Sequence, residues 1–144
     1  MSELKKKYLH TTIIPIRWGD MDALGHINNT EYFRYMEQTR VEWLEEMGYT
    51  VDLTQKEGIV VVTANCTFKV PLVYPGSVEV QMYIENVGRS SFSTTYELRL
   101  RGNDLMYAEG SSTLVWISIA TAKSIPLPSN LKMHLESRLS QGKF

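Results

Sequence analysis

One long helical pattern followed by four strand-like runs constrains the fold of this chain more than any other feature. Apolar side chains recur at helical spacings over residues 28–47, with polar residues between them. Runs rich in β-forming residues follow at 59–70, 77–87, 90–101 and 105–118. A single helix of this kind buries its apolar face only if the strands form a sheet that wraps around it. The sequence therefore predicts an α+β fold.

A first strand and a last helix complete the expected order of elements. Residues 8–18 are rich in β-forming residues, and Pro15 suits an edge strand better than a central one. Gly48 marks the end of the long helix, and two prolines separate the last strand from a short helix at about 129–139. We expect one domain over residues 1–144.

Short polar links predict antiparallel pairing between strands that follow one another in the sequence. Residues 86–89 and 101–104 are such links, and the second contains a Gly-Asn pair that suits a tight hairpin. Apolar residues such as Met82 and Ile84 are expected on the outer face of the sheet, against Val80 and Tyr83. Association with another copy would cover that apolar surface.

A segment rich in Asp, Gly, His and Asn immediately precedes the long helix, over residues 17–32. Asn28 with Glu31 three residues later resembles a capping box at the helix start. The first backbone N–H groups of a helix lack internal partners and carry about half a unit of positive charge, so they can polarise a carbonyl group. A nearby carboxylate, from Asp20 or Asp22, could attack that carbonyl or activate water. The segment therefore predicts acyl-group hydrolysis.

Charge and cysteine content exclude several other classes of protein. Fifteen Lys and Arg against sixteen Asp and Glu leave a net charge of −1, which argues against nucleic-acid or membrane partners. The basic run at residues 5–7 is not followed by the apolar core of a signal peptide. Cys66 is the only cysteine, so a reducing, cytoplasmic location is expected and its thiol is interpreted as buried and inert. His10, His26 and His134 lack the spacing of metal ligands.

Five features of the sequence together resemble one known family. The main one is residues 19–32, and the weaker ones are 68–71, Gly76, 88–92 and 107–110. With these features the chain resembles the hotdog-fold acyl-CoA thioesterases of the 4-hydroxybenzoyl-CoA thioesterase type. The similarity extends over nearly the whole chain. The resemblance implies a hotdog fold, in which an antiparallel sheet of about five strands wraps one long helix, here with a short C-terminal helix.

The resemblance also implies catalytic residues. It selects Asp22 over Asp20 as the nucleophile or general base, and Asn29 as the residue whose backbone N–H polarises the thioester carbonyl. Some members carry an assisting His where Asn29 stands. His26 is the corresponding candidate here, with a positioning role favoured over proton transfer. Other hotdog thioesterases use a helix Glu, which makes Glu37 the weaker alternative to Asp22.

Substrate binding is expected to involve two copies of the chain. In the resembling family the active sites lie at dimer interfaces, with coenzyme A held partly by the partner, so a dimer is the minimal unit and a tetramer of two dimers is favoured. No metal or redox cofactor is expected, since coenzyme A is part of substrate and product. Arg89 could bind phosphate, although residues 89–91 could equally form a solvated turn. The predicted substrate-binding residues are Gly25, Tyr32, Arg89, Ser90 and Ser91.

The predicted function is hydrolysis of an acyl-CoA thioester to a free carboxylic acid and coenzyme A. The alternative is a non-catalytic module that binds acyl-CoA or an acyl-carrier protein, which predicts saturable binding without turnover. Hydratase or dehydratase activity on the same fold ranks third. Regulatory DNA binding ranks last, because the sequence shows neither a basic face nor an added helix-turn-helix segment.

Overall fold

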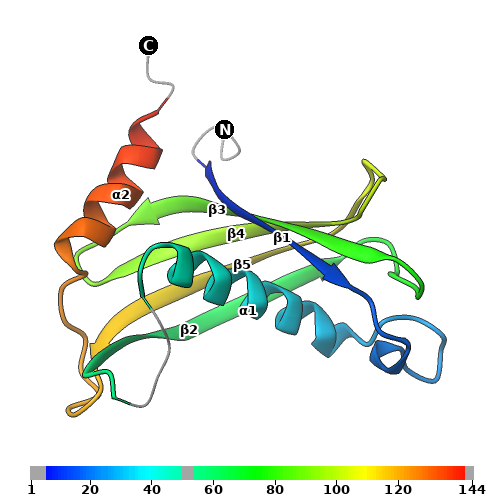
Figure 1. Cartoon of the computed structure of the whole chain (residues 1–144), viewed down its shortest axis with the longest axis horizontal. Coiled ribbons are helices and arrows are strands. Elements are labelled where there is room, and N and C mark those ends of the chain that lie inside the picture. Colours follow the sequence, from blue (N-terminus) through cyan, green and yellow to red (C-terminus); the bar gives the residue numbers. More distant parts are fainter. Residues whose placement is uncertain (1–5, 50–53, 142–144) are drawn as a thin grey trace.

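The computed structural model describes residues 6–49 and 54–141. One long helix lies along one face of a single sheet, and a shorter helix stands at one end of that sheet (Figure 1). The elements in chain order are β1 (Lys7–Pro15), the 3₁₀ helix η2 (Trp18–Asp20), α1 (Asn29–Glu46), β2 (Glu57–Phe68), β3 (Ser77–Val87), β4 (Ser91–Leu100), β5 (Met106–Ser118) and α2 (Ser129–Ser140).

This order confirms the α+β prediction, with shifts at some boundaries. The predicted bounds of β3 match at both ends, because polar and Gly-containing turns flank this strand. The first strand ends at Pro15 rather than residue 18, since the chain turns into η2 beyond it. β2 begins at Glu57, two residues earlier than expected.

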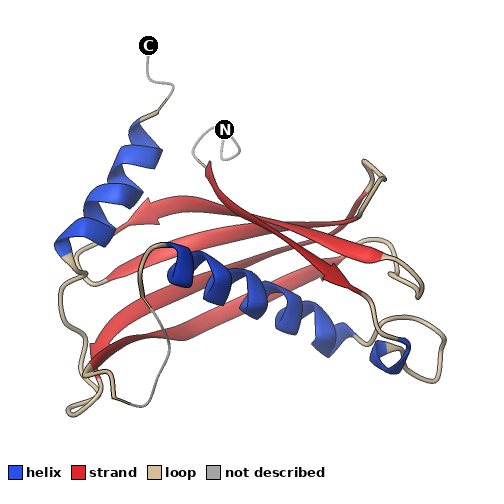
Figure 2. Cartoon of the chain, in the orientation of Figure 1, coloured by secondary structure: helices blue, strands red, loops and turns tan. Residues whose placement is uncertain are grey.

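All five strands belong to one antiparallel sheet with the spatial order β1-β3-β4-β5-β2. Figure 2 shows α1 crossing this sheet on one face, with the loops gathered beyond the sheet ends. α1 packs against β1, β3 and β2, while α2 packs against β3 and β1. The sheet therefore wraps the long helix, as in the expected hotdog arrangement.

The expectation that every strand pairs with its sequence neighbour is wrong for β2. The pairs β3–β4 and β4–β5 do form, but β2 pairs with β5 and β3 pairs with β1. The reason is the connection at residues 69–76, which is too long for a tight hairpin and crosses the end of the sheet from the edge strand β2 to β3, the neighbour of the other edge strand β1. Backbone bonds from Ile27 N–H to Leu72 O (2.8 Å) and from Ile16 N–H to Gly76 O (2.8 Å) hold this crossover in place.

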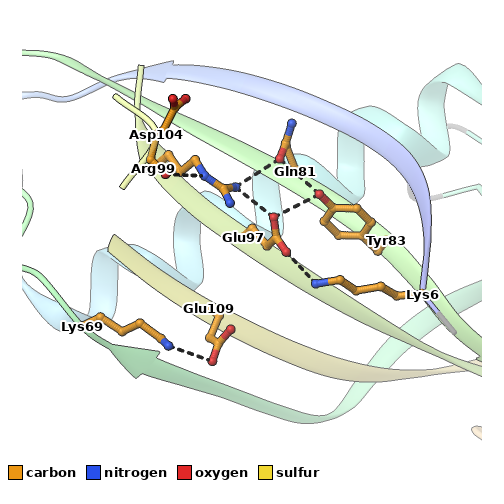
Figure 3. A network of polar contacts seen from close by, with 8 residues as sticks. All are labelled: Lys6, Lys69, Gln81, Tyr83, Glu97, Arg99, Asp104 and Glu109. Atoms are coloured by element: carbon orange, nitrogen blue, oxygen red, sulfur yellow. Dashed lines mark hydrogen bonds and ion pairs between the residues drawn. The ribbon is translucent and has the colours of Figure 1, made fainter. Parts of the chain in front are cut away.

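The expectation of outward Met82 and Ile84 is also wrong. Both side chains are fully buried on the helix side of β3, together with Val80, because these residues alternate along the strand with the outer-facing ones. The outer face instead carries a polar network (Figure 3). In it, Glu97 accepts hydrogen bonds from Lys6, from Arg99 Nη1 at 2.9 Å and from the Tyr83 hydroxyl at 3.1 Å.

The outer edge of β2 has no strand beside it in the described chain. Within the sheet, β2 pairs only with β5. Three consecutive valines of this strand are exposed, by 38% at Val60, 43% at Val61 and 54% at Val62. An open, apolar edge of this length is a surface that proteins normally cover. Separately, no helix within residues 6–49 or 54–141 is long and apolar enough to span a bilayer.

Candidate active site

Residues 20–28 form a narrow loop that returns the chain to the start of α1. Asn28 N–H donates to Asp20 O at 2.9 Å, and Asp22 N–H donates to His26 O at 2.8 Å. The tip closes through a bond from Gly25 N–H to Asp22 O (3.0 Å), with Gly25 at φ +81°, a conformation that favours glycine. Backbone bonds therefore fix the position of Asp22 relative to the helix start.

The carboxylate of Asp22 is exposed and only partly engaged. Its Oδ1 accepts the Leu24 N–H at 3.0 Å, which is a local turn interaction typical of Asp. No partner for the second carboxylate oxygen is recorded within residues 6–49 and 54–141. One oxygen thus orients the group, and the other is available for chemistry.

The start of α1 presents a free backbone donor. Asn28 is the N-cap, and its Oδ1 accepts the Thr30 N–H at 2.9 Å rather than that of Glu31 as a capping box requires. The Glu31 N–H donates to Asn28 O at 2.9 Å. Among the described residues the Asn29 N–H has no recorded acceptor, so it remains unpaired at the positive end of the helix dipole.

Asp22, His26, Asn29 and Tyr32 come together around one cavity of about 370 Å³. These are four of the eight residues that the sequence predicted for the site. Gly25 lies in the same loop but does not line the cavity. The complete lining is Asp22, His26, Ile27, Asn29, Tyr32, Phe68, Lys69, Val70 and Pro71.

The opposite wall of this cavity comes from the end of β2 and the crossover, which sequence reasoning did not assign to the site. The Tyr32 ring lies edge-to-face against Phe68, with 4.9 Å between the ring centroids. The Tyr32 hydroxyl oxygen accepts the Leu72 N–H at 3.1 Å. Burial is the main cause that raises the pKa of Tyr32, so the phenol stays neutral at ordinary pH. Its ring faces the cavity, while its oxygen binds the protein backbone.

Asp20, the other candidate carboxylate, shapes the loop rather than facing the cavity. It is only 6% exposed, and its Oδ2 accepts hydrogen bonds from Arg17 N–H (3.2 Å) and from the Tyr35 hydroxyl (3.1 Å). The Arg17 side chain also pairs with this carboxylate, with 3.7 Å between Arg17 Nε and Asp20 Oδ1. Burial, followed by the charge of Asp20, raises the pKa of Tyr35. Asp20 therefore fastens the loop to the body of α1.

Glu37, the alternative carboxylate, lies outside the Asp22 cavity. It pairs with Arg34 at 3.5 Å and lines a different groove, of about 380 Å³, which also contains Ile14 and Pro15 of β1. Within one chain, Glu37 is therefore not positioned to act on a group bound beside Asn29.

The turn between β3 and β4 lies at the opposite end of the sheet from the loop that precedes α1 (Figure 1). Arg89 and Ser90 belong to this turn, and Ser91 is the first residue of β4. The turn that carries them is held by backbone bonds from Leu127 N–H to Arg89 O and from Trp116 N–H to Ser90 O. Arg89 itself is exposed. One chain alone does not bring these three residues to the cavity, so their predicted role stays a prediction that needs a second copy.

The remaining nucleophile and metal candidates do not form a second site. Burial raises the pKa of Cys66 to about 11, which keeps this half-buried thiol protonated and agrees with its interpretation as inert. In the part of the chain that the structure describes, no three His, Cys, Asp or Glu side chains gather closely enough to hold a metal ion.

Comparison with known proteins gives a consistent result. The family model of the thioesterase-like superfamily matches residues 16–135. The solved PA2801 protein of Pseudomonas aeruginosa is 38% identical, with 90% of this chain and 99% of that chain covered and a TM-score of 0.86. The long-chain acyl-CoA thioesterase FadM of Escherichia coli is 25% identical over 87% of this chain and 96% of its own length. A relative from Aquifex aeolicus is 32% identical, but the match covers 56% of this chain and only 65% of that protein.

Proposed function

This chain belongs to the thioesterase-like superfamily of thioester hydrolases, and we propose that it hydrolyses acyl-CoA thioesters to a free carboxylic acid and coenzyme A. One observation carries the proposal: the Asp22 carboxylate and the unpaired Asn29 N–H border the same cavity. A thioester carbonyl needs such a donor on its oxygen and a carboxylate near its carbon. The FadM name supports an acyl-CoA as the substrate class.

In the proposed mechanism the Asn29 N–H binds the carbonyl oxygen while negative charge grows on it. The free oxygen of Asp22 then either attacks the carbonyl carbon or removes a proton from an attacking water. Direct attack expels coenzyme A thiolate, which is protonated by solvent, and leaves a mixed anhydride that water hydrolyses. Attack by water forms a tetrahedral oxyanion, whose collapse gives the carboxylic acid and expels coenzyme A thiolate. The thiolate then takes the proton that Asp22 removed from the water. The α1 dipole stabilises the oxyanion in both routes, and neither needs a group beyond these residues and water.

His26 and Gly25 are proposed to serve this pair indirectly. The backbone oxygen of His26 accepts the Asp22 N–H, and Gly25 allows the tight turn at the tip. The His26 ring is exposed at the cavity, where it can position substrate. Tyr32 contributes its ring to the cavity wall.

We also propose that two chains pair along their β2 edges in antiparallel fashion. The open edge and its exposed valines support this arrangement. Glu57 of β2 lies at the same end of the sheet as Ser91, while Phe68 lies at the cavity end. Antiparallel pairing over about 36 Å of strand would bring the Arg89 turn of one copy toward the Asp22 cavity of the other. Coenzyme A phosphates would then meet Arg89, Ser90 and Ser91, and two such dimers would make the proposed tetramer.

The test is thiol release from short-chain, medium-chain, long-chain and aromatic acyl-CoA esters. Asp22→Asn is compared with the native chain and with Glu37→Gln at equal folded concentration. Because Asp22 acts on the substrate itself, we expect its variant to lose about 100-fold or more in kcat, whereas Glu37→Gln keeps native turnover. Near-native turnover by Asp22→Asn would contradict the assignment.

The alternative is a module that binds acyl-CoA or an acyl-carrier protein without turnover. The same cavity could hold a thioester in either case. Saturable binding of these esters, with no thiol released from any of them, would favour this alternative over the hydrolase.

A further inference from the structure

One residue of the crossover, Leu72, is hydrogen-bonded on both sides of the start of α1 through its backbone N–H and C=O groups. Leu72 N–H donates to the Tyr32 hydroxyl oxygen at 3.1 Å, and Leu72 O accepts the Ile27 N–H at 2.8 Å. Ile27 lies two residues before Asn29, and Tyr32 lies three residues after it. We call this arrangement the Leu72 clamp. All three residues are at most 4% exposed, so solvent does not replace these bonds.

The Leu72 clamp joins the two walls of the candidate active site. The first wall carries Asp22 and the Asn29 N–H, and the second wall is the segment at 68–71. Phe68 contacts the Tyr32 ring at 4.9 Å, so Tyr32 holds the second wall through its oxygen and through its ring. Tyr32 and Leu72 are 40 residues apart in the sequence, and the hydroxyl bond joins the two segments directly.

We propose that Tyr32 is a positioning residue that keeps the two walls of the active site in register through the Leu72 clamp. This inference rests on the proposed function. The acyl group enters between the walls, and its carbonyl must meet the Asn29 N–H while Asp22 faces its carbon. A displacement of about 1 Å in such an arrangement can lower the rate by about 100-fold. The clamp limits that displacement, because its two bonds flank Asn29.

Removal of one atom tests the clamp. Tyr32→Phe keeps the ring and its Phe68 contact but deletes the oxygen that binds Leu72 N–H. The matched control is Tyr96→Phe. Tyr96 is also almost fully buried and its hydroxyl contacts Thr94 and Ser112, but these residues do not line the cavity. Both variants therefore remove a buried, hydrogen-bonded phenol oxygen, and of the two residues only Tyr32 lines the cavity.

Two measurements separate positioning from a general loss of stability. Amide hydrogen exchange should accelerate about tenfold or more at Leu72 and Ile27 in Tyr32→Phe, and stay unchanged there in Tyr96→Phe. With the best acyl-CoA ester, we expect kcat of Tyr32→Phe to fall about tenfold while KM changes less than about threefold. Tyr96→Phe should keep native kcat.

Unchanged exchange at Leu72, or equal kcat in the two variants despite accelerated exchange, would overturn the proposal. Failure of the Leu72 clamp can be told apart from failure of the proposed function. If the native chain released no thiol from any ester, hydrolysis would be refuted, and the exchange rates at Leu72 and Ile27 would still decide whether Tyr32 holds the two walls together.

Discussion

A negative charge placed at the N-cap of α1 should separate helix stability from catalysis. Asn28→Asp keeps an oxygen for the Thr30 N–H, which now lies 2.9 Å from Asn28 Oδ1. Asp is as good an N-cap as Asn, and an anion near a helix start typically adds about 0.5 kcal/mol of stability. We therefore expect the free energy of unfolding to stay constant or to rise slightly.

The same charge should slow the reaction, because it repels the oxyanion held by Asn29 N–H. Thr30 N is the amide next to Asn29 N, so the new charge and the oxyanion would be about 6 Å apart, which at an effective dielectric of about 20 to 40 costs about 1–3 kcal/mol. This corresponds to a decrease in kcat of about tenfold to 100-fold.

Thiol release and thermal unfolding should be measured together on three variants. Asn28→Ser is the neutral control, since Ser also caps well and carries no charge. Asn28→Ala should lose about 1 kcal/mol of stability, because it leaves the Thr30 N–H without its acceptor. If Asn28→Asp is stable and still turns over like Asn28→Ser, the oxyanion does not form at this helix start and the mechanism is wrong.

Three further substitutions test other parts of the structure. Burial raises the pKa of Glu97, but hydrogen bonds from Lys6 and Arg99 outweigh this effect and hold the pKa below its usual value. The Glu97 carboxylate therefore stabilises the fold above about pH 4.3, and this stabilisation is lost as the pH falls through the folded-state pKa. Glu97→Gln should therefore flatten the acid limb of a stability curve measured by urea unfolding. Val62→Lys on the open β2 edge should lower the mass measured by light scattering toward that of the monomer. Val73→Lys, which also changes an exposed valine, should not lower it. Equal masses for both variants would argue against β2 pairing. Gly25→Ala should lower the unfolding free energy by about 1 kcal/mol because of its φ of +81°, and Gly19→Ala, which has open space and no such φ, serves as its control.

The sequence predicts most elements of the fold because their signals are local. The turns on either side of β3 and the Asn28 cap lie within a few residues of the boundaries that they mark. The pairing of β2 with β5 is not local, since it depends on a crossover whose path the sequence does not encode in any short motif. The alternation along β3 does contain the buried face, since Val78, Val80, Met82 and Ile84 alternate with mainly polar residues. The expectation of an outward Met82 is therefore wrong because it does not follow this period of two.

The candidate site also contains residues with a local sequence signal and residues that only the fold brings together. Asp22 and Asn29 are seven residues apart, so one motif carries both, and the structure brings both to one cavity. Phe68 and the residues after it reach the cavity only through tertiary packing. In the sequence these residues show a proline after a strand and a weak family resemblance, and neither signal identifies a cavity wall. Arg89 does not reach the cavity within one chain, and its proposed role depends on a second chain that no pattern within one sequence describes.

The short loop at 20–28 makes the reactive groups a self-contained unit. Its own backbone bonds set the distance between the Asp22 carboxylate and the amide of Asn29, so this distance does not depend on which side chains lie across the cavity. We therefore expect that side-chain changes at 69–71, which leave Phe68 and the backbone bonds of Leu72 in place, can admit a longer, bulkier or aromatic acyl group while the reactive groups stay in position. For protein engineering, substrate range and reaction chemistry are thus separate variables in this scaffold, because different segments of the chain determine them.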